Sequence, residues 1–412
     1  MGIEGFRAFI KSRAPGAIST IMMVEFKGTR IAIDANLFMY MMMSGANVQS
    51  WQKIDLKTDP GATPDMLELT VYWIKMMLDR IINLCSYGIT PVFVFDGTNK
   101  PKKAPVQESR RKEKQKSKEE ATLVKDKLEA ILPHERSDED IKILRSKKQN
   151  IVYVNEDQIN LFKNFLRVAG VPIIIADGDG EELCCTLAHL GKVSAVYSKD
   201  ADCAIFGAPI TITGVTKGSK PPTQTFDVFL YDKLSSELSI SREKLIDMCI
   251  LHGCDYSPGV RGYGLITAYK KIVEYGCIEN IPGIDLKGID VNETRDSFRI
   301  KGLSECLSPV HEGILPSLNI NKDALLQHGA RPFFQSYSLG NLIFPLLSSY
   351  ENLTVITDRG AEYILPNGRI IPTVSGNIIV KRPVSYSTPD KNKHDYSTLE
   401  VVDPVKSMIH FE

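Results

Sequence analysis

The chain has 412 residues, enough for two domains or for one large domain with elaborations. Its 50 Lys and Arg residues balance 50 Asp and Glu residues, which excludes a uniformly basic nucleic-acid binder but allows a local basic patch. We expect no membrane span, because no apolar run reaches about 18 residues, and no signal peptide, because the N-terminus lacks a long apolar core.

The first hundred residues contain two short apolar runs that each end in a carboxylate. Residues 31–33 predict a buried strand ending at Asp34, and residues 91–95 predict another ending at Asp96. The remaining patterns predict an amphipathic helix, a Met-rich helix, a polar loop and a long amphipathic helix, over residues 1–10, 37–42, 44–64 and 67–86.

A basic segment follows the second of these strands. Residues 100–118 hold nine Lys or Arg and two Glu, and mixed charge continues to Lys148. Such a run is usually a solvated helix, but a basic arm beside a metal site would neutralise phosphates. Because the segment has few large apolar residues, we expect it to be mobile until something negative orders it.

The densest group of acidic residues lies between residues 176 and 202. It follows a predicted helix (157–169) and strand (171–175), and it encloses a second helix (183–190) and strand (193–197). Its carboxylates are Asp177, Asp179, Glu181, Glu182, Asp200 and Asp202. Two ionised carboxylates about 4 Å apart repel by roughly 4 kcal/mol at an effective dielectric near 20.

Such carboxylates either point apart into water, as a solvated acidic loop, or collect around a hard divalent cation such as Mg²⁺ or Mn²⁺. A calcium loop starting at Asp177 is excluded, because Glu182 would occupy the position of its glycine. Three strands end in carboxylates, at residues 34, 96 and 200. In an open parallel sheet, ligand sites form at that edge, so we favour the metal site.

The next segment offers a further carboxylate and a glycine-rich turn. Strands are predicted at 210–213 and 226–231, and a helix at 244–252 with Ser241 as its N-cap. Asp255 follows that helix. The turn at 259–264 leads into a helix at 265–275, an arrangement that presents backbone N–H groups to a phosphate.

The C-terminal third changes character along its length. Residues 279–350 are mixed and mostly helical in pattern, residues 353–384 predict a β-hairpin or meander, and the tail after Ser385 is polar and loose. Eight cysteines without a Cys-x-x-Cys pair indicate buried, reduced thiols rather than a zinc site.

Taken in order, these motifs resemble those of flap structure-specific endonucleases of the xeroderma pigmentosum G nuclease family. The matching pieces are Met-Gly-Ile at the start, Ile31-Ala-Ile-Asp34-Ala, Val92-Phe-Val-Phe-Asp96-Gly97, Asp200-Ala-Asp202-Cys203, Leu251-His-Gly-Cys-Asp255-Tyr256 and Arg261-Gly-Tyr-Gly264. The likeness covers roughly residues 1–280, and the order and spacing of the motifs agree as well as their letters. The β-rich tail is atypical of the cellular enzymes and resembles the divergence of homologues from large DNA viruses.

The resemblance implies a PIN-like α/β domain with a central, mostly parallel sheet flanked by helices, a helix–two-turn–helix motif and a small β-rich C-terminal extension. The implied regions are a nuclease region at 1–100, a basic helical arch at 101–150, a second nuclease region at 151–280 with the helix–two-turn–helix at 253–275, a helical region at 281–350, and a β-hairpin region with a polar tail at 351–412.

The resemblance also implies roles for individual residues. One metal position would be held by Asp34, Asp96, Asp179 and Glu181, and the second by Asp200, Asp202 and Asp255. Lys103 and Arg110 would contact the scissile phosphate. The implied DNA contacts are Gly2, Tyr40, Arg80, Gly253, Gly262 and Gly264, with Tyr40 stacking on a base and a monovalent cation at the helix–two-turn–helix.

Three departures from the family pattern are visible. Asp179 stands where the family has Glu, Ala46 and Asn47 stand where it has a basic residue, and no sliding-clamp peptide is seen near the C-terminus. The implied enzyme is a monomeric 5′ flap endonuclease and 5′-3′ exonuclease that uses two Mg²⁺ ions, with Mn²⁺ as a substitute, on branched DNA. It would work in replication, repair or recombination, in the nucleus or, for a viral enzyme, at a cytoplasmic replication site.

Two other hypotheses stay open from the sequence. A nuclease of the same family could prefer four-way junctions or bubbles, and a catalytically weak DNA-binding scaffold could share the fold. The presence of all seven carboxylates argues against the scaffold.

Overall fold

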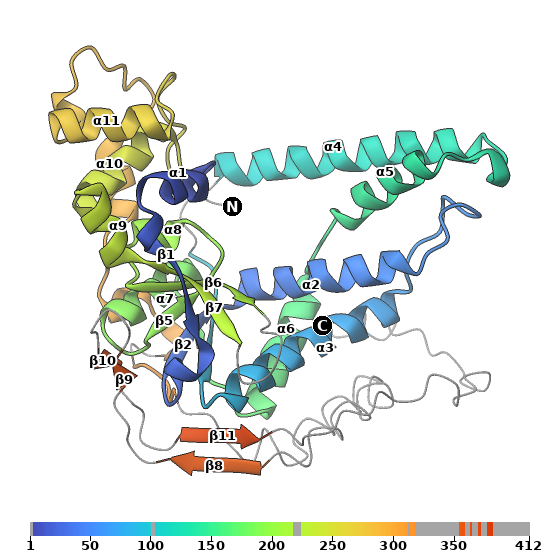
Figure 1. The fold of residues 1–412 in the computed structure, drawn as a ribbon, viewed down its shortest axis with the longest axis horizontal. Coiled ribbons are helices and arrows are strands. Elements are labelled where there is room, and N and C mark those ends of the chain that lie inside the picture. Colours follow the sequence, from blue (N-terminus) through green and yellow to red (C-terminus); the bar gives the residue numbers. More distant parts are fainter. Residues whose placement is uncertain are drawn as a thin grey trace.

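A seven-stranded sheet forms the centre of the molecule in the computed structural model, which describes residues 3–99, 104–216, 224–311 and 314–318 and the backbone of four short strands between 354 and 381 (Figure 1). The strands are β1 (Ile18–Met22), β2 (Arg30–Asp34), β3 (Thr90–Phe95), β4 (Ile173–Ile175), β5 (Ala195–Tyr197), β6 (Ile210–Thr216) and β7 (Thr225–Leu230). Their order is β1-β7-β6-β5-β2-β3-β4. The five strands from β6 to β4 are parallel, whereas β7 and β1 add an antiparallel edge.

Helices cover both faces of this sheet. They are α1 (Phe6–Arg13), α2 (Ala35–Gln52), α3 (Met66–Ser86), α4 (Ala104–Glu129), α5 (Asp138–Gln149), α6 (Glu156–Val168), α7 (Gly180–His189), α8 (Asp202–Ile205), α9 (Tyr231–Leu238), α10 (Arg242–His252), α11 (Leu265–Tyr275), α12 (Val291–Ser297) and α13 (Leu303–Cys306). None of the described helices is both long and apolar enough to cross a membrane.

Alternate residues along the central strands pack into two separate hydrophobic cores. Ile31 and Ile33 of β2 face the core made with α2, α3 and α6, whereas Ala32 faces the core made with α7 and α10. Strand β3 repeats the pattern, with Phe93 on the first side and Val94 on the second. This two-sided burial explains why the strands read as continuous apolar runs, and it confirms the expected α/β class.

The basic segment forms two helices. We call α4 and α5 together the arm; they pack against each other, and α5 also contacts α2 (Figure 1). A small apolar cluster holds their distal ends, with Leu128 and Leu144 fully buried against Trp51. A few well-placed apolar residues thus supply a local core for this part of the segment, whereas its expected mobility stays a prediction.

Arg136 fixes the turn between α4 and α5. Its side chain is buried and donates hydrogen bonds to the carbonyl oxygens of Leu128, Ile131, Lys57 and Thr58. One of these acceptors lies in α4, one in the turn that follows it, and two in the α2–α3 connection. One guanidinium thus joins segments about eighty residues apart in the chain.

The predicted loop at residues 44–64 is also partly wrong, since α2 continues to Gln52. Ala46 and Asn47 are buried there, and the Asn47 amide donates a hydrogen bond of 2.8 Å to the carbonyl oxygen of Gln149. At these two positions the family pattern has a basic residue. In this chain they serve the packing of α2 against the end of α5.

Two outcomes concern the C-terminal third. The hairpin prediction is confirmed, because β8 (Thr354–Asp358) pairs with β11 (Asn377–Lys381) and β9 (Tyr363–Ile364) with β10 (Ile370–Ile371), both antiparallel. The helical prediction for residues 279–350 is met only by the short α12 and α13 within the described residues; positions 319–353 and the tail after 381 lie outside them.

Candidate metal centre

Three neighbouring parallel strands bring acidic residues to one edge of the sheet. Asp34 ends β2, Asp96 follows β3, and Asp200 follows β5, and β2 lies between the other two strands. Because the carboxyl ends of parallel strands share one edge, residues far apart in the sequence gather there. The strand prediction made from sequence therefore places these three as expected.

Backbone hydrogen bonds orient the first two carboxylates. Asp34 is the N-cap of α2, and its Oδ1 accepts a hydrogen bond of 3.0 Å from the N–H of Leu37. Asp96 Oδ1 accepts one of 2.9 Å from the N–H of Gly180, and Asn36 donates to Asp96 Oδ2. Asp96 is thereby tied to the first residue of α7.

Close backbone approach keeps the turn after β3 against the acidic stretch. A Cβ atom at Gly97 would lie 2.1 Å from the carbonyl oxygens of Ala176 and Asp177. A Cβ atom at Gly180 would lie 3.0 Å from Asp96 Oδ1. Glycine at both positions allows the two segments to touch.

Helix α7 contributes the next two acidic residues. Asp179 is its N-cap and accepts a hydrogen bond of 2.9 Å from the N–H of Glu181. Glu181 is buried, and its Oε1 accepts hydrogen bonds of 3.0 Å from both Ser198 Oγ and Cys203 Sγ. These two donors were not singled out from the sequence, since neither residue type at that spacing marks a carboxylate-supporting role.

The other two carboxylates of the same stretch turn elsewhere. The buried Glu182 forms an ion pair with the half-buried Lys301, with 2.8 Å between Oε1 and Nζ. Asp177 accepts a hydrogen bond of 2.9 Å from the Asn99 side chain. Asp179 and Glu181 thus lie at the candidate metal centre, whereas Asp177 and Glu182 join neighbouring segments of the chain.

Three carboxylates lie close enough together to hold one ion. Glu181, Asp200 and Asp202 each offer an oxygen atom, and these atoms lie within 4.8 Å of one another. Asp202 begins α8 and is fully buried, whereas Asp200 is half-buried. An all-oxygen donor set suits a hard divalent cation such as Mg²⁺ or Mn²⁺.

The pKa values of the buried acids report the same accumulation of negative charge. Burial raises the pKa of the Asp34 carboxyl to about 7, and the neighbouring Asp96 carboxylate adds to this, with Asp179 and Asp200 contributing further. Burial likewise raises the pKa of Glu181 well above its ordinary value, together with the Cys203 thiol and the carboxylates of Asp200 and Asp202. A bound cation would offset these penalties, so the residues fit a metal ion.

Asp255 occupies a different setting from the other acids. It is buried in the turn after α10, beside Cys254, whose N–H donates to the carbonyl oxygen of Ser257. It is not one of the three carboxylates within 4.8 Å. Its assignment to a second metal position stays a prediction.

Comparison with known proteins gives two matching family profiles, the XPG N-terminal domain over residues 1–118 and the XPG I-region over residues 170–255. Flap endonuclease 1 of Glycine max is 33% identical over 284 residues, 68% of this chain and 68% of that protein. Flap endonuclease 1 of Meyerozyma guilliermondii is 30% identical over 308 residues, 73% of this chain and 74% of that protein.

The chain belongs to the XPG family of flap endonucleases. The fold agrees: the catalytic core of Rad2 in complex with a DNA substrate superposes with a TM-score of 0.51 and 17% identity, over 84% of this chain and 99% of that one.

The structure describes several of the positions that the XPG family likeness implies for DNA contact. The Tyr40 hydroxyl donates a hydrogen bond of 2.7 Å to the carbonyl oxygen of Val152. Arg80 lies on α3. Burial raises the pKa of the Tyr197 hydroxyl, and the positive charge of Arg80 offsets part of that rise. Arg110 lies on α4, of which only the backbone is described at that point, whereas Lys103 and Gly2 lie outside the described residues.

The glycines of the helix–two-turn–helix have conformations that their positions require. Gly253 ends α10 with φ 106°, and Gly262 has φ 89°, both in the region that favours glycine. Gly264 is the N-cap of α11, and a Cβ atom there or at Gly262 would meet open space. The backbone before α11 is thus open to an approaching molecule in this member of the XPG family.

Proposed function

We propose that this chain is a metal-dependent nuclease that hydrolyses DNA phosphodiesters at 5′ flaps and trims 5′ ends exonucleolytically. The observation that supports it most is the set of three carboxylates, Glu181, Asp200 and Asp202, at the carboxyl edge of a parallel sheet. Family membership adds the expectation of flap DNA as substrate.

The proposed site holds two divalent cations, Mg²⁺ or Mn²⁺. Asp34, Asp96, Asp179 and Glu181 would hold one, and Asp200, Asp202 and Asp255 the other. Bound together, such ions supply an activated water and charge neutralisation at the scissile phosphate. The chain's part is to hold the donor oxygens in place, which Ser198 and Cys203 do for Glu181.

The surrounding elements would orient the DNA. Lys103 and Arg110, at the start of the arm, would contact the scissile phosphate and offset its charge. Tyr40, whose hydroxyl donates a hydrogen bond to the carbonyl oxygen of Val152, would stack its ring on an unpaired base. Arg80 and Gly2 would contact the junction.

The turn from α10 to α11 would hold the uncleaved duplex. Gly253 ends α10, Gly262 and Gly264 leave the backbone before α11 accessible, and a monovalent cation there is part of the proposal. We further propose a monomer that works in the nucleus or, for a viral enzyme, at a cytoplasmic replication site.

The test is cleavage of an end-labelled 5′ flap by the purified chain, with and without Mg²⁺. We expect Mg²⁺-dependent cutting near the junction. A four-way junction and a bubble of the same sequence serve as parallel substrates, because preferential cutting of either would favour the second specificity. Binding of all three substrates without cutting in Mg²⁺ or Mn²⁺ would favour the scaffold.

A further inference from the structure

The start of the chain is joined to the end of α10 by one side chain. Nε2 of the His252 ring lies 3.0 Å from the carbonyl oxygen of Glu4, although the two residues are 248 positions apart in the sequence. A carbonyl oxygen can only accept a hydrogen bond, so Nε2 carries the proton and donates. Among the described residues, no other hydrogen bond joins residues 3–13 to residues 242–275.

The other nitrogen of this ring is buried. Nδ1 of His252 has no hydrogen-bond partner within the part of the chain that the structure describes. Buried polar atoms are normally paired, so the ring occupies this position at a cost in free energy. A leucine side chain would avoid that cost. The bond to Glu4 is therefore what a histidine contributes at this position.

The Glu4 carbonyl group lies next to a flexible point in the backbone. Gly5 is the N-cap of α1 and has φ 72°, in the left-handed region. Glycine has the greatest backbone freedom of all residues, so α1 alone does not fix the direction of the residues before it. Of residues 3–5, only Ile3 is buried. The bond from His252 thus restrains the backbone on the far side of Gly5.

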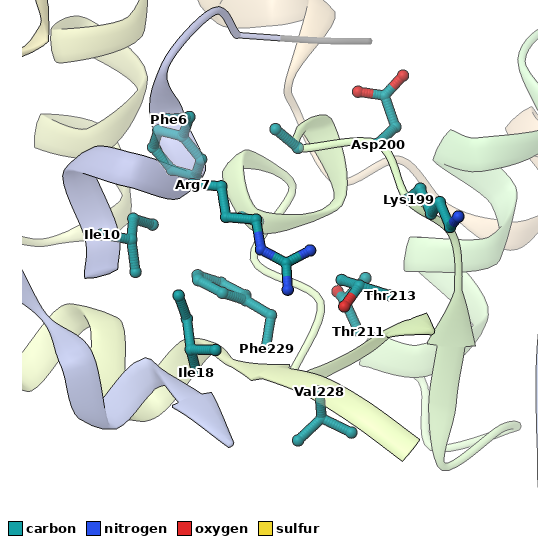
Figure 2. A pocket seen from close by; sticks show the side chains of 12 residues that line it. Phe6, Arg7, Ile10, Ile18, Lys199, Asp200, Thr211, Thr213, Val228 and Phe229 are labelled. Carbon is teal, nitrogen blue, oxygen red and sulfur yellow. The ribbon is translucent and has the colours of Figure 1, made fainter. Parts of the chain in front are cut away.

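Helix α1 itself is anchored by other contacts. Phe6 and Ile10 are buried, and Figure 2 shows both of them lining one cavity with Phe229 of β7. Phe9 packs edge-on against Tyr269 of α11, with 5.7 Å between the ring centroids. Loss of the histidine bond would therefore release the residues before α1 and leave the helix in place.

The same bond borders a groove between α1 and α11. This groove has a volume of about 500 Å³, and both Glu4 and His252 line it, together with Gly264, the N-cap of α11. His252 is followed directly by Gly253, where the turn toward α11 begins. One hydrogen bond thus links the chain start to the turn proposed for the uncleaved duplex.

We propose that His252 is a positioning residue that fixes the chain start relative to the turn from α10 to α11. By holding the Glu4 carbonyl group, it limits where Gly2 can meet the junction while the turn holds the duplex. The bond to be cut is thereby selected at a set distance from the junction. That Gly2 and the turn contact DNA rests on the proposed function, whereas the restraint on the chain start does not.

The first experiment tests the restraint without DNA. Hydrogen–deuterium exchange of the full chain in EDTA follows the N-terminal peptide, in which the N–H of Phe6 donates to the carbonyl oxygen of Ile3. His252→Leu should speed this exchange by about tenfold, because the lost hydrogen bond favours local opening. His252→Gln keeps an amide donor and should exchange like the unmodified chain.

The control for this experiment is His134→Leu, at an exposed position in the turn between α4 and α5. It should leave the exchange of the N-terminal peptide unchanged. Unchanged exchange in His252→Leu would overturn the proposal.

The second experiment maps where an end-labelled 5′ flap is cut in Mg²⁺. We expect one dominant product from the unmodified chain and from His252→Gln, and products spread over neighbouring nucleotides from His252→Leu. His252→Leu should also lower kcat/KM by about fivefold without changing Mn²⁺ binding. A role confined to stability would lower the rate without moving the cut.

An unchanged cut position in His252→Leu would overturn the proposal. Absence of cutting by the unmodified chain would refute the proposed function, and with it the role of His252 in selecting the cut. The exchange measurement would still decide whether His252 restrains the chain start, so the two failures are distinguishable.

Discussion

Ser198 Oγ lies 3.0 Å from Glu181 Oε1 and donates a hydrogen bond to it. Ser198 follows β5 directly, so the end of one strand orients a carboxylate carried by α7. We expect Ser198→Ala to lower Mg²⁺-dependent cutting by about tenfold, as for partners that orient metal ligands. Raising the Mg²⁺ concentration should recover part of the rate. Ser236→Ala, at an exposed position on α9, is the matched control, and equal rates in the two variants would contradict this role.

Asp200→Ala should reduce Mg²⁺-dependent cutting of a flap to background while leaving DNA binding nearly intact. The substitution removes one of three oxygens that lie within 4.8 Å of one another, whereas the elements proposed to contact DNA are untouched. Gel-based cleavage and fluorescence anisotropy measure the two effects. Asp232→Ala removes an exposed carboxylate from α9 and should behave like the unmodified chain. Rates like those of the unmodified chain in Asp200→Ala would refute the metal assignment.

Arg110→Ala should slow cutting by about a hundredfold, because a cation opposite the scissile phosphate would be lost. Metal binding, followed by calorimetry with Mn²⁺, should not change. Lys127→Ala, which removes a charge from the distal end of the same helix, is the control. Loss of metal binding in Arg110→Ala would make its role structural.

The metal-free chain should lose stability as pH rises from about 4 to about 7. The pKa of Asp34 is raised from 3.8 to about 7 in the folded state, so the folded chain retains a proton that the unfolded chain releases. Its contribution is complete below pH 4 and is lost as pH passes 7, by at most about 4 kcal/mol.

Thermal unfolding in EDTA across this range measures the effect. Saturating Mg²⁺ should flatten the profile, since the cation takes the place of the proton. Asp34→Asn should reduce the slope without metal, and the dependence that remains should come from Glu181, whose pKa is also raised by burial. A profile in EDTA that rises with pH would show that these acids are not buried together.

Gly97→Ala should destabilise the fold by about 3 kcal/mol, because its methyl group would meet two backbone carbonyl oxygens 2.1 Å away. The exposed neighbour offers a control in Thr98→Ala, which should leave the thermal midpoint unchanged. Similar midpoints for the two variants would mean that the turn can move without loss.

The sequence was sufficient to predict those strands and helices whose own residues and immediate neighbours determine them. Strands β2 and β3 are buried on both faces, so each is recognisable as a continuous run of apolar residues. Helix α11 has the predicted bounds of Leu265–Tyr275 because glycines flank it. The edge strand β1 was not predicted, since only one of its five residues is buried and two hydroxyl residues interrupt its apolar run.

The remaining features depend on residues distant in the sequence. The buried Asn47 side chain on α2 donates a hydrogen bond to the carbonyl oxygen of Gln149. Glu182 accepts one from Lys301, which lies 119 residues later in the chain. No window around either residue contains its partner. The same reason explains why Asp177 and Glu182 could not be separated from Asp179 and Glu181 by sequence alone.

The buried Arg136 has a consequence for the affinity with which the arm would bind DNA. Its four carbonyl acceptors and the apolar cluster around Leu128 and Leu144 keep the distal half of the arm folded without DNA. The conformational entropy of this part is therefore lost during folding rather than on association. If the arm contacts DNA as proposed, binding is spared that part of the entropic cost, and the arm is preorganised for its ligand.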